Sequence, residues 1–442
     1  MDGRAPSGLS WLVMKVPEIL QIETPQTPGS LASVLNVIAE MGLVLEHVTT
    51  VRREQGRTLW EITLEIEESE QQGLIERLSS LPTARFVGWS DRAFERHRGG
   101  KIEMRSRVAI STQQILRDIY LPGVARVCLA IQKQPVRAFE FTYVARAVAV
   151  ISDGSAIPGV GQVGGRASLP VVEGRAALLA SLVGLSAIPI LVESTSVEHF
   201  VEAVRAIAPS FGAIMLANIS APRCFEIERK LRGQLDMPVL LDDQHGTAVV
   251  ALAALFNAAR IAGIQLADAD VGLIGVGKAG LGIARLLRTH GVARLFGTDT
   301  RPEAMGRLAE LRGQGATLEQ VMARARIVIA TTGRKGLIEP HHIRRGQIIL
   351  SLSQPDPEIE SVDALASGAA IAADAKSLSS VLAFPGLFAG ALRSGARDID
   401  DRMLLAAARA IAEAAPEGQL APDPLNPALH ETVTAAVAAC AK

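Results

Sequence analysis

The chain has 442 residues, of which 48% are hydrophobic and 21% are charged. That composition is typical of a globular protein with ample core and length for about three domains, and it excludes a disordered chain. Lysine and arginine (45) nearly balance aspartate and glutamate (46), and aromatic residues make up only 4%. Since neither a basic field nor many stacking platforms are present, nucleic acid is not expected as a partner.

The cysteines and the apolar runs indicate the cellular compartment. The three cysteines are Cys128, Cys224 and Cys440. An odd number at wide spacing fits neither a disulfide framework nor a zinc site. The start, MDGRAPSGLSWLVMKV, lacks the features of a signal peptide, and the longest uncharged apolar run, AALLASLVGLSAIPILV, is too short to cross a membrane. These features predict a cytoplasmic protein with no membrane partner.

Residues 16–98 form the first unit, with the predicted order strand, helix, strand, strand, helix, strand. The unit resembles an ACT regulatory domain, mainly through TPGSLASVLNVIAEMG. The resemblance implies a dimer interface and a site for a small effector, often an amino acid. A packing module that binds no effector is the equal alternative.

A glycine loop opens a later unit. In ADVGLIGVGKAGLGIARLL a hydrophobic strand leads into Gly275, Gly277 and Gly280 and then into a helix, and Asp299 ends the next strand. This order is that of a dinucleotide-binding fold, in which the glycines admit the pyrophosphate and the acidic residue accepts from the ribose 2′-hydroxyl. The pattern predicts NAD as cofactor, while Arg301 leaves NADP possible.

Eight segments in order, among them YLPGVARVCLAI, LPVVEGRAALL, APRCFEIERKL and MPVLLDDQHGTAVVALAAL, resemble bacterial malic enzymes that carry an N-terminal ACT domain. The resemblance implies an α/β fold class with three parts after the ACT-like domain. These are a malic-enzyme-type substrate domain over 101–265, a Rossmann-type NAD-binding domain with a parallel sheet over 266–390, and C-terminal helices over 391–442. The family oxidises malate with NAD or NADP and decarboxylates the product with the help of a divalent cation. A homodimer and a small 2-hydroxy or 2-keto acid as ligand are expected.

Two positions match the family's proton-transfer residues. Tyr120 matches the tyrosine that serves as general acid. Arg175 stands where the family has a lysine as general base. A guanidinium keeps its proton, with a pKa above about 12, so Arg175 is a poor base but a good ligand for a carboxylate.

The family binds its cation with three carboxylates. Asp243 matches one of them and Asp242 its neighbour, but Ala217 and Asn218 stand where glutamate and aspartate are expected. Asp243 and Asn218 remain as weak metal ligands at best, and the cation is doubtful because most of the anionic charge is lost. Asp242 and Asp243 are instead expected to act as anions at the N-terminus of a helix.

On the substrate side, Gln354, Ser379 and Ser380 stand where the family has asparagines. Three hypotheses follow. The chain is an active oxidoreductase that handles malate or another 2-hydroxy acid by a modified route, or it is a catalytically silent relative that binds NAD and an effector. A metabolite sensor without nucleotide is disfavoured by the glycine loop.

Overall fold

The computed structural model describes residues 16–66, 68–90 and 92–441. Residues 1–15, which contain most of the stretch assessed for a signal peptide, lie outside the described residues. The chain divides into two compact units, Met1–Lys101 and Ile102–Lys442. Each unit contains a hydrophobic core of its own.

The first unit has an antiparallel sheet in the order β2-β3-β1-β4. Its elements are β1 (Val16–Pro25), α1 (Ser30–Glu40), β2 (Val44–Glu54), β3 (Arg57–Ile66), α2 (Glu68–Ser79), β4 (Arg85–Ser90) and α3 (Arg92–His97). Apolar residues of β1, β3, α1 and α2, such as Leu20, Val34, Ile62 and Leu74, form the core. The predicted order of strands and helices is confirmed, while the effector site stays a prediction.

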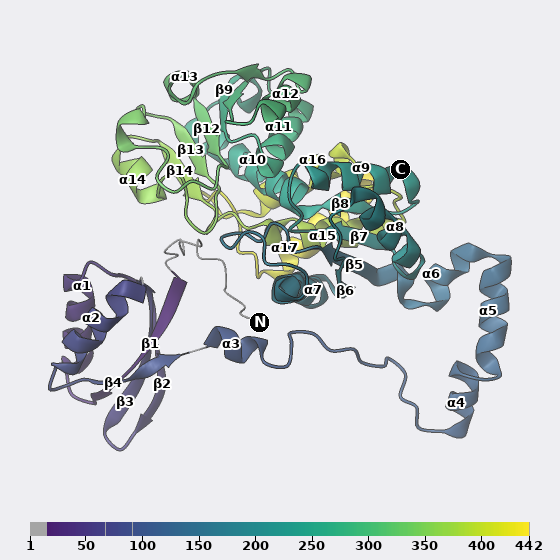
Figure 1. The fold of residues 1–442 in the computed structure, drawn as a ribbon, viewed down its shortest axis with the longest axis horizontal. Coiled ribbons are helices and arrows are strands. Elements are labelled where there is room, and N and C mark those ends of the chain that lie inside the picture. The colour runs from purple at the N-terminus through teal and green to yellow at the C-terminus, as the bar shows by residue number, and fades with distance from the viewer. Residues whose placement is uncertain (1–15, 67, 91, 442) are drawn as a thin grey trace, which may run out of the picture. The chain divides into compact units, whose positions relative to one another are not determined.

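The second unit begins with an arm of short helices (Figure 1). These are α4 (Gln113–Ile119), α5 (Gly123–Lys133) and α6 (Ala138–Phe141). None of the three helices contains a buried residue. The arm therefore adds nothing to the core within one chain.

A parallel four-stranded sheet follows, in the order β6-β5-β7-β8. Its strands are β5 (Ala147–Ser152), β6 (Ser186–Leu191), β7 (Ala213–Leu216) and β8 (Val239–Leu241), and its helices are α7 (Leu169–Val183), α8 (Val197–Ile207) and α9 (Arg223–Gln234). Strand β5 is buried along its whole length, as parallel strands covered on both faces are.

The second parallel sheet has six strands in the order β11-β10-β9-β12-β13-β14. The strands are β9 (Asp270–Ile274), β10 (Arg294–Thr298), β11 (Gln314–Gly315), β12 (Ile327–Ala330), β13 (Ile348–Ser351) and β14 (Ile371–Asp374). Its helices are α11 (Lys278–His290), α12 (Pro302–Glu310), α13 (Leu318–Arg324) and α14 (Ser361–Ala366). Counted from β9, the order is 3-2-1-4-5-6, which is that of the dinucleotide-binding fold. The predicted α/β class with a Rossmann-type sheet is confirmed.

Helix α10 (Asp242–Ala262) follows directly on β8 and leads toward β9. It is the one helix in the described part of the chain that is long and apolar enough to cross a membrane, and 72% of its apolar window is buried inside the fold. A helix that is apolar on all sides and buried is the core helix of a folded domain. Helices α11 and α16 pack against it.

Three further helices complete the second unit, namely α15 (Phe384–Ser394), α16 (Asp401–Ala414) and α17 (Pro427–Cys440). They pack against one another, and α15 and α17 also pack on α7. Single turns of 3-10 helix occur at η1 (Pro135–Arg137), η2 (Tyr143–Arg146), η3 (Arg166–Ser168), η4 (Ala208–Ser210), η5 (Leu266–Asp268), η6 (Pro340–His342) and η7 (Ser380–Leu382).

Candidate active site

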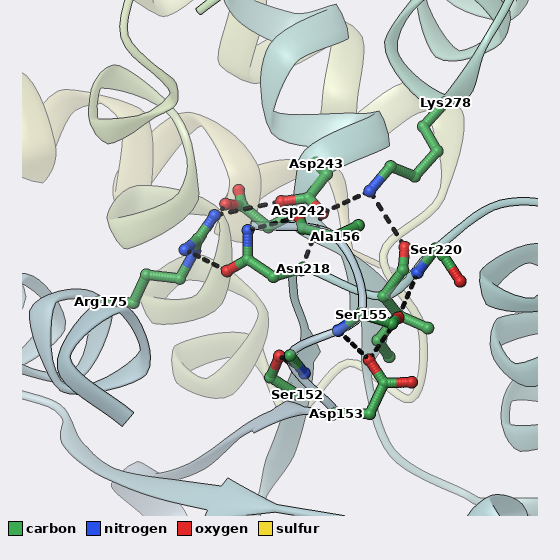
Figure 2. A network of polar contacts seen from close by, with 12 residues as sticks. Ser152, Asp153, Ser155, Ala156, Arg175, Asn218, Ser220, Asp242, Asp243 and Lys278 are labelled. Carbon is green, nitrogen blue, oxygen red and sulfur yellow. Dashed lines mark hydrogen bonds and ion pairs between the residues drawn. The ribbon is translucent and has the colours of Figure 1, made fainter. Parts of the chain in front are cut away.

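A cluster of charged side chains lies at the carboxyl ends of β7 and β8. The two strands pair in parallel, so the residues that follow them come out at the same edge of the sheet. Asn218 follows β7, and Asp242 and Asp243 open α10 directly after β8. Arg175 reaches them from α7 (Figure 2).

Arg175 binds three partners at once. Its Nε donates to Asp242 Oδ2 at 3.2 Å, its Nη2 to Asp243 Oδ1 at 3.1 Å, and its Nη1 to Asn218 Oδ1 at 2.9 Å. The Arg175 side chain is 16% exposed. The donors of the planar guanidinium therefore bind both carboxylates and the amide oxygen at the same time.

Asn218 is held in a left-handed conformation, with φ at 57°. Its backbone N–H donates to Asp243 Oδ2 at 2.8 Å, and its carbonyl accepts from the Ala156 N–H at 3.0 Å. Asparagine tolerates this conformation better than most residues. The loop is also fixed from below, because Ser155 Oγ accepts from the Ser220 N–H at 2.8 Å and donates to Asp153 (Figure 2).

Lys278 brings a second cation to the cluster from the other sheet. It is the first residue of α11, within the glycine loop. Its Nζ donates to Asp243 Oδ2 at 2.9 Å and to the Ile219 carbonyl at 3.0 Å. The contact joins the end of the four-stranded sheet to the glycine loop of the six-stranded sheet.

Burial acts to raise the pKa of both carboxyl groups. For Asp242, burial outweighs the attraction of Arg175 and raises the pKa to about 6. For Asp243, the charges of Lys278 and Arg175, with hydrogen bonds from Lys278 and the Asn218 N–H, outweigh burial and hold the pKa below its usual range. Asp243 is thus ionised at neutral pH and its charge is balanced by side chains of the protein.

These residues do not fit a divalent cation. Among residues 16–66, 68–90 and 92–441 no group of three or more histidine, cysteine, aspartate or glutamate side chains could hold a metal ion. Ala217 has no ligand atom, Asn218 Oδ1 accepts from Arg175, and both oxygens of Asp243 accept from donors. Asp242 and Asp243 do lie in the first turn of α10, as predicted, but their partners are Arg175 and Lys278.

The glycine loop has the close approaches that a pyrophosphate site needs. Gly275 adopts φ of 88°, and a Cβ built there would lie 2.8 Å from the Thr331 carbonyl oxygen. A Cβ on Gly280 would collide with the Gly275 carbonyl. The loop therefore requires glycine at both positions, and it exposes the N-terminus of α11 as an anion site. These residues fit a dinucleotide.

Asp299 is already engaged at the end of β10. Its Oδ2 accepts from the Val276 N–H at 2.9 Å, and its Oδ1 accepts from the Arg301 N–H at 2.9 Å and from Arg301 Nε at 3.0 Å. Burial acts to raise the pKa of Asp299, but the hydrogen bonds from Arg301 and Val276 hold it below its usual range. Arg301 is 53% exposed and paired with Asp299, so a cation lies beside the carboxylate that is predicted to bind the ribose.

Tyr120 is not brought together with the cluster. It follows α4 on the arm and is 65% exposed. Arg175 and Asp243 belong to α7 and α10, which lie apart from α4 and α5 of the arm (Figure 1). The role of Tyr120 as a general acid therefore stays a prediction, because within one chain Tyr120 does not lie at the cluster.

Of the three predicted substrate residues, one lies near the cluster. Ser380 opens η7, and a side chain built at Gly246, in the second turn of α10, would collide with Asp242 and come close to Ser380. Ser379 caps η7 by accepting from the Val381 N–H at 3.3 Å. Gln354 lies in a separate cavity with Pro158, Ser353 and Asp374. Only Ser380 is thus shown beside the carboxylates.

Lys278 is a member of the charged cluster that the sequence analysis did not single out. It occupies a variable position of the glycine pattern, GVGKAG, where any residue satisfies the pattern. A lysine at this position could have been noticed, because its long cationic side chain can reach an anionic group several ångströms from the start of the helix. Its partner, Asp243, lies in the first turn of α10, after a strand of the other sheet, and could not be inferred from spacing.

Sheet order and glycine loop together define a dinucleotide-binding protein of the doubly wound α/β class. A family description of the malic enzyme N-terminal domain matches residues 99–196, and one of the malic enzyme NAD binding domain matches residues 244–316 and 376–442. NAD-dependent malic enzyme 1 of Bacillus subtilis is 45% identical over 95% of this chain and 96% of its own length. The chain therefore belongs to the malic enzyme family.

Further relatives agree with this assignment. The NAD-dependent malic enzyme of Geobacillus stearothermophilus is 36% identical over 88% of this chain and 86% of its own length. The crystal structure of malic enzyme from Pyrococcus horikoshii superposes with a TM-score of 0.75 at 34% identity, covering 79% of this chain and 89% of that one. Both sequence and fold thus support the family.

Proposed function

We propose that the chain is an NAD-dependent oxidoreductase that acts on malate or a related 2-hydroxy acid. The observation that carries the proposal is the 2.9 Å contact between Lys278 Nζ and Asp243 Oδ2. It joins the glycine loop to the charged cluster, so a dinucleotide and a small acid bound there would be neighbours. The NAD-dependent malic enzymes of the two bacilli support the choice of substrate and cofactor.

The chain's own residues supply binding more clearly than proton transfer. Bound NAD would supply the hydride acceptor for the hydroxy acid. The glycine loop with the α11 N-terminus would hold its pyrophosphate, and Asp299 its ribose. Arg175 has two of its five N–H donors left after its three described hydrogen bonds, and these suit a substrate carboxylate.

Metal-dependent decarboxylation does not follow from these residues. Arg175 cannot accept the hydroxyl proton, and the cluster does not fit a cation. The second candidate function is therefore a catalytically silent homologue that binds NAD and an effector. The observation that favours it is the guanidinium of Arg175, bound to both aspartates where a base is needed.

A spectrophotometric assay separates the two candidates. Purified chain is given NAD and, in turn, malate and other 2-hydroxy acids, and NADH is followed at neutral pH in EDTA and in Mn²⁺. NADH formation supports the oxidoreductase. Binding of NAD by calorimetry without NADH formation supports the silent homologue, and no NAD binding at millimolar concentration contradicts both.

We also propose that the protein is a cytoplasmic homodimer. The arm that carries Tyr120 exposes apolar side chains at Leu116, Ile119, Leu121 and Leu129, each at least 40% exposed. A second copy of the chain would cover them. Sedimentation of the full chain tests this, and a monomer at micromolar concentration contradicts it.

The first unit is proposed to bind a small effector, as its resemblance to ACT domains implies. Its own core supports independent folding. Thermal shift against the amino acids tests the full chain and residues 102–442 in parallel. An effector that stabilises only the full chain supports the proposal, and identical responses of both contradict it.

A further inference from the structure

The cations that surround Asp242 and Asp243 match the two carboxylates in number. Arg175 contacts both aspartates, and Lys278 contacts Asp243. The cluster is therefore neutral when all four groups are charged. A divalent cation entering it would meet two fixed positive charges and would have to displace one of them.

Lys278 holds the position at Asp243 with its own geometry. Its Nζ is 2.9 Å from Asp243 Oδ2, and the Ile219 carbonyl is a second acceptor at 3.0 Å. The side chain is 19% exposed. A lysine ammonium has three donors, so two are engaged and the third is left for a ligand in the cluster.

We propose that Lys278 takes the place of the family's divalent cation at Asp243. Its ammonium holds the 2-oxygen of a hydroxy or keto acid beside the dinucleotide, and the site works without metal. The inference rests on the proposed function for the class of ligand. The glycine loop would then bind two ligands: its backbone would bind the nucleotide, and the Lys278 side chain would bind the acid.

Lys278 suits this position by its charge and by its reach. A cation at this position must be close to Asp243 and must come from beside the expected nucleotide, and Lys278 Nζ reaches Asp243 from the glycine loop. A lysine is a point charge with rotatable donors, so it attracts an oxygen that becomes negative. It carries one charge instead of two, and Arg175 supplies the other.

The first test is metal binding by the unaltered full chain. Mn²⁺ is titrated and free ion is followed by electron paramagnetic resonance. We expect no stoichiometric binding below millimolar Mn²⁺. Stoichiometric binding in the micromolar range, lost in Asp243→Asn, overturns the proposal without any variant of Lys278.

The second test uses oxalate, a planar dianion that resembles the enolate of a keto acid, in the presence of EDTA and NADH. Calorimetry should show binding to the wild type and at least tenfold weaker binding to Lys278→Ala, with Lys278→Arg in between. Lys230→Ala is the matched control, because Lys230 is 25% exposed and also contacts two carboxylates, Glu198 and Glu226, outside the cluster. Equal oxalate affinity in Lys278→Ala and wild type overturns the proposal.

A gain of metal binding separates this role from a structural one. Ala217→Glu with Asn218→Asp adds the missing carboxylates, and Lys278→Ala then removes the tethered cation. We expect Mn²⁺ to bind at least tenfold more tightly to the triple variant than to the double variant. Equal affinity in two folded variants would mean that Lys278 does not compete for the cation's place, and would overturn the proposal.

The proposed function can fail separately. If oxalate binds through Lys278 in EDTA but no 2-hydroxy acid yields NADH, the inference stands and the oxidoreductase fails. If malate is oxidised only with added Mn²⁺ or Mg²⁺, the oxidoreductase stands and the inference is overturned.

Discussion

The glycine loop and the charged cluster are neighbours, but they depend on the sequence in different ways. In the loop, the backbone itself makes the site, and a single methyl group at Gly280 would collide with the Gly275 carbonyl. In the cluster, side chains make the site: Arg175 pairs with Asp242 and Asp243, and Lys278 pairs with Asp243, without the family's lysine, glutamate and aspartate. A backbone site admits few changes, while a side-chain site admits a new set of groups if the charges still balance.

The largest expected effect comes from rebuilding the cluster. Ala217→Glu, Asn218→Asp, Arg175→Lys and Lys278→Ala together restore the cation ligands and a group that can act as a base. We expect Mn²⁺-dependent oxidation of malate to rise by about 10² to 10⁴-fold over wild type, the range that general base catalysis supplies. NADH formation with Mn²⁺ and with EDTA measures the change.

The matched control for this rebuilt cluster keeps Arg175 and carries the other three substitutions. It should bind Mn²⁺ but gain little turnover. A rebuilt variant that folds and binds Mn²⁺ yet gains less than tenfold contradicts the view that base and ligands are what distinguish this cluster.

The backbone side of the comparison is tested by Gly280→Ala. The added methyl group pushes against the Gly275 carbonyl, so we expect the free energy of unfolding to fall by about 1–3 kcal/mol and NAD affinity to fall at least tenfold. Gly306→Ala is the control, because a Cβ there meets nothing within 4 Å in α12. It should stabilise the protein by about 0.5–1 kcal/mol. Unchanged NAD affinity in Gly280→Ala would remove the loop from the cofactor site.

The support beneath the cluster is tested at Glu228. Its Oε1 accepts from the Leu241 N–H and is paired with His245 Nε2, both at 3.0 Å, which fixes the turn from which Asp242 and Asp243 project. Glu228→Gln should lower the free energy of unfolding by about 1.5–3 kcal/mol, the value of a hydrogen bond to a charged group. Denaturant unfolding measures this, with the more exposed Glu226→Gln as a control expected to change by less than about 1 kcal/mol.

The pH dependence of the Glu228 effect has a defined sign. Burial acts to raise the pKa of Glu228, but His245 and the Leu241 N–H hold it below the usual 4.5. A carboxyl group with a lowered pKa stabilises the fold above its unfolded pKa and loses that contribution as the pH falls through its folded pKa. The difference between wild type and Glu228→Gln should therefore be full at pH 6 and shrink below pH 4.5. A difference that grows on acidification would contradict this.

The smallest expected effect concerns cofactor choice. Arg301→Ala removes the exposed cation beside Asp299 and frees the carboxylate for a ribose hydroxyl. We expect the ratio of NAD to NADP affinity to rise by about 2- to 5-fold, since exposed ion pairs contribute up to about 1 kcal/mol. Calorimetry with both nucleotides measures it, and Arg307→Ala, on the same α12 helix, should leave the ratio unchanged. A ratio that falls in Arg301→Ala means that Arg301 favours NAD.

The sequence was sufficient to predict the elements of the fold for a physical reason. Buried parallel strands such as Ala147–Ser152 appear as uninterrupted apolar runs, and the glycine loop has a pattern set by backbone geometry. These features are local, and local features can be predicted without contacts.

The sequence predicted which residues belong to the site, but not which residues they contact. Arg175, Asn218 and Asp243 were found because the resemblance marks their positions. That Arg175 binds all of Asp242, Asp243 and Asn218, and that Arg301 occupies Asp299, depends on side-chain directions across distant segments. Lys278 was missed because its partner lies 35 residues away, in the first turn of α10.

Helix α10 has a consequence for how this protein can change over time. It has 21 residues, and its first turn carries Asp242 and Asp243 while its length packs on α11 and α16. Each residue inserted or deleted in its middle would rotate one end against the other by about 100° and shift it by about 1.5 Å. The aspartates or the core contacts would then be out of register. Variation in this helix is thus confined to exchange of side chains at constant length.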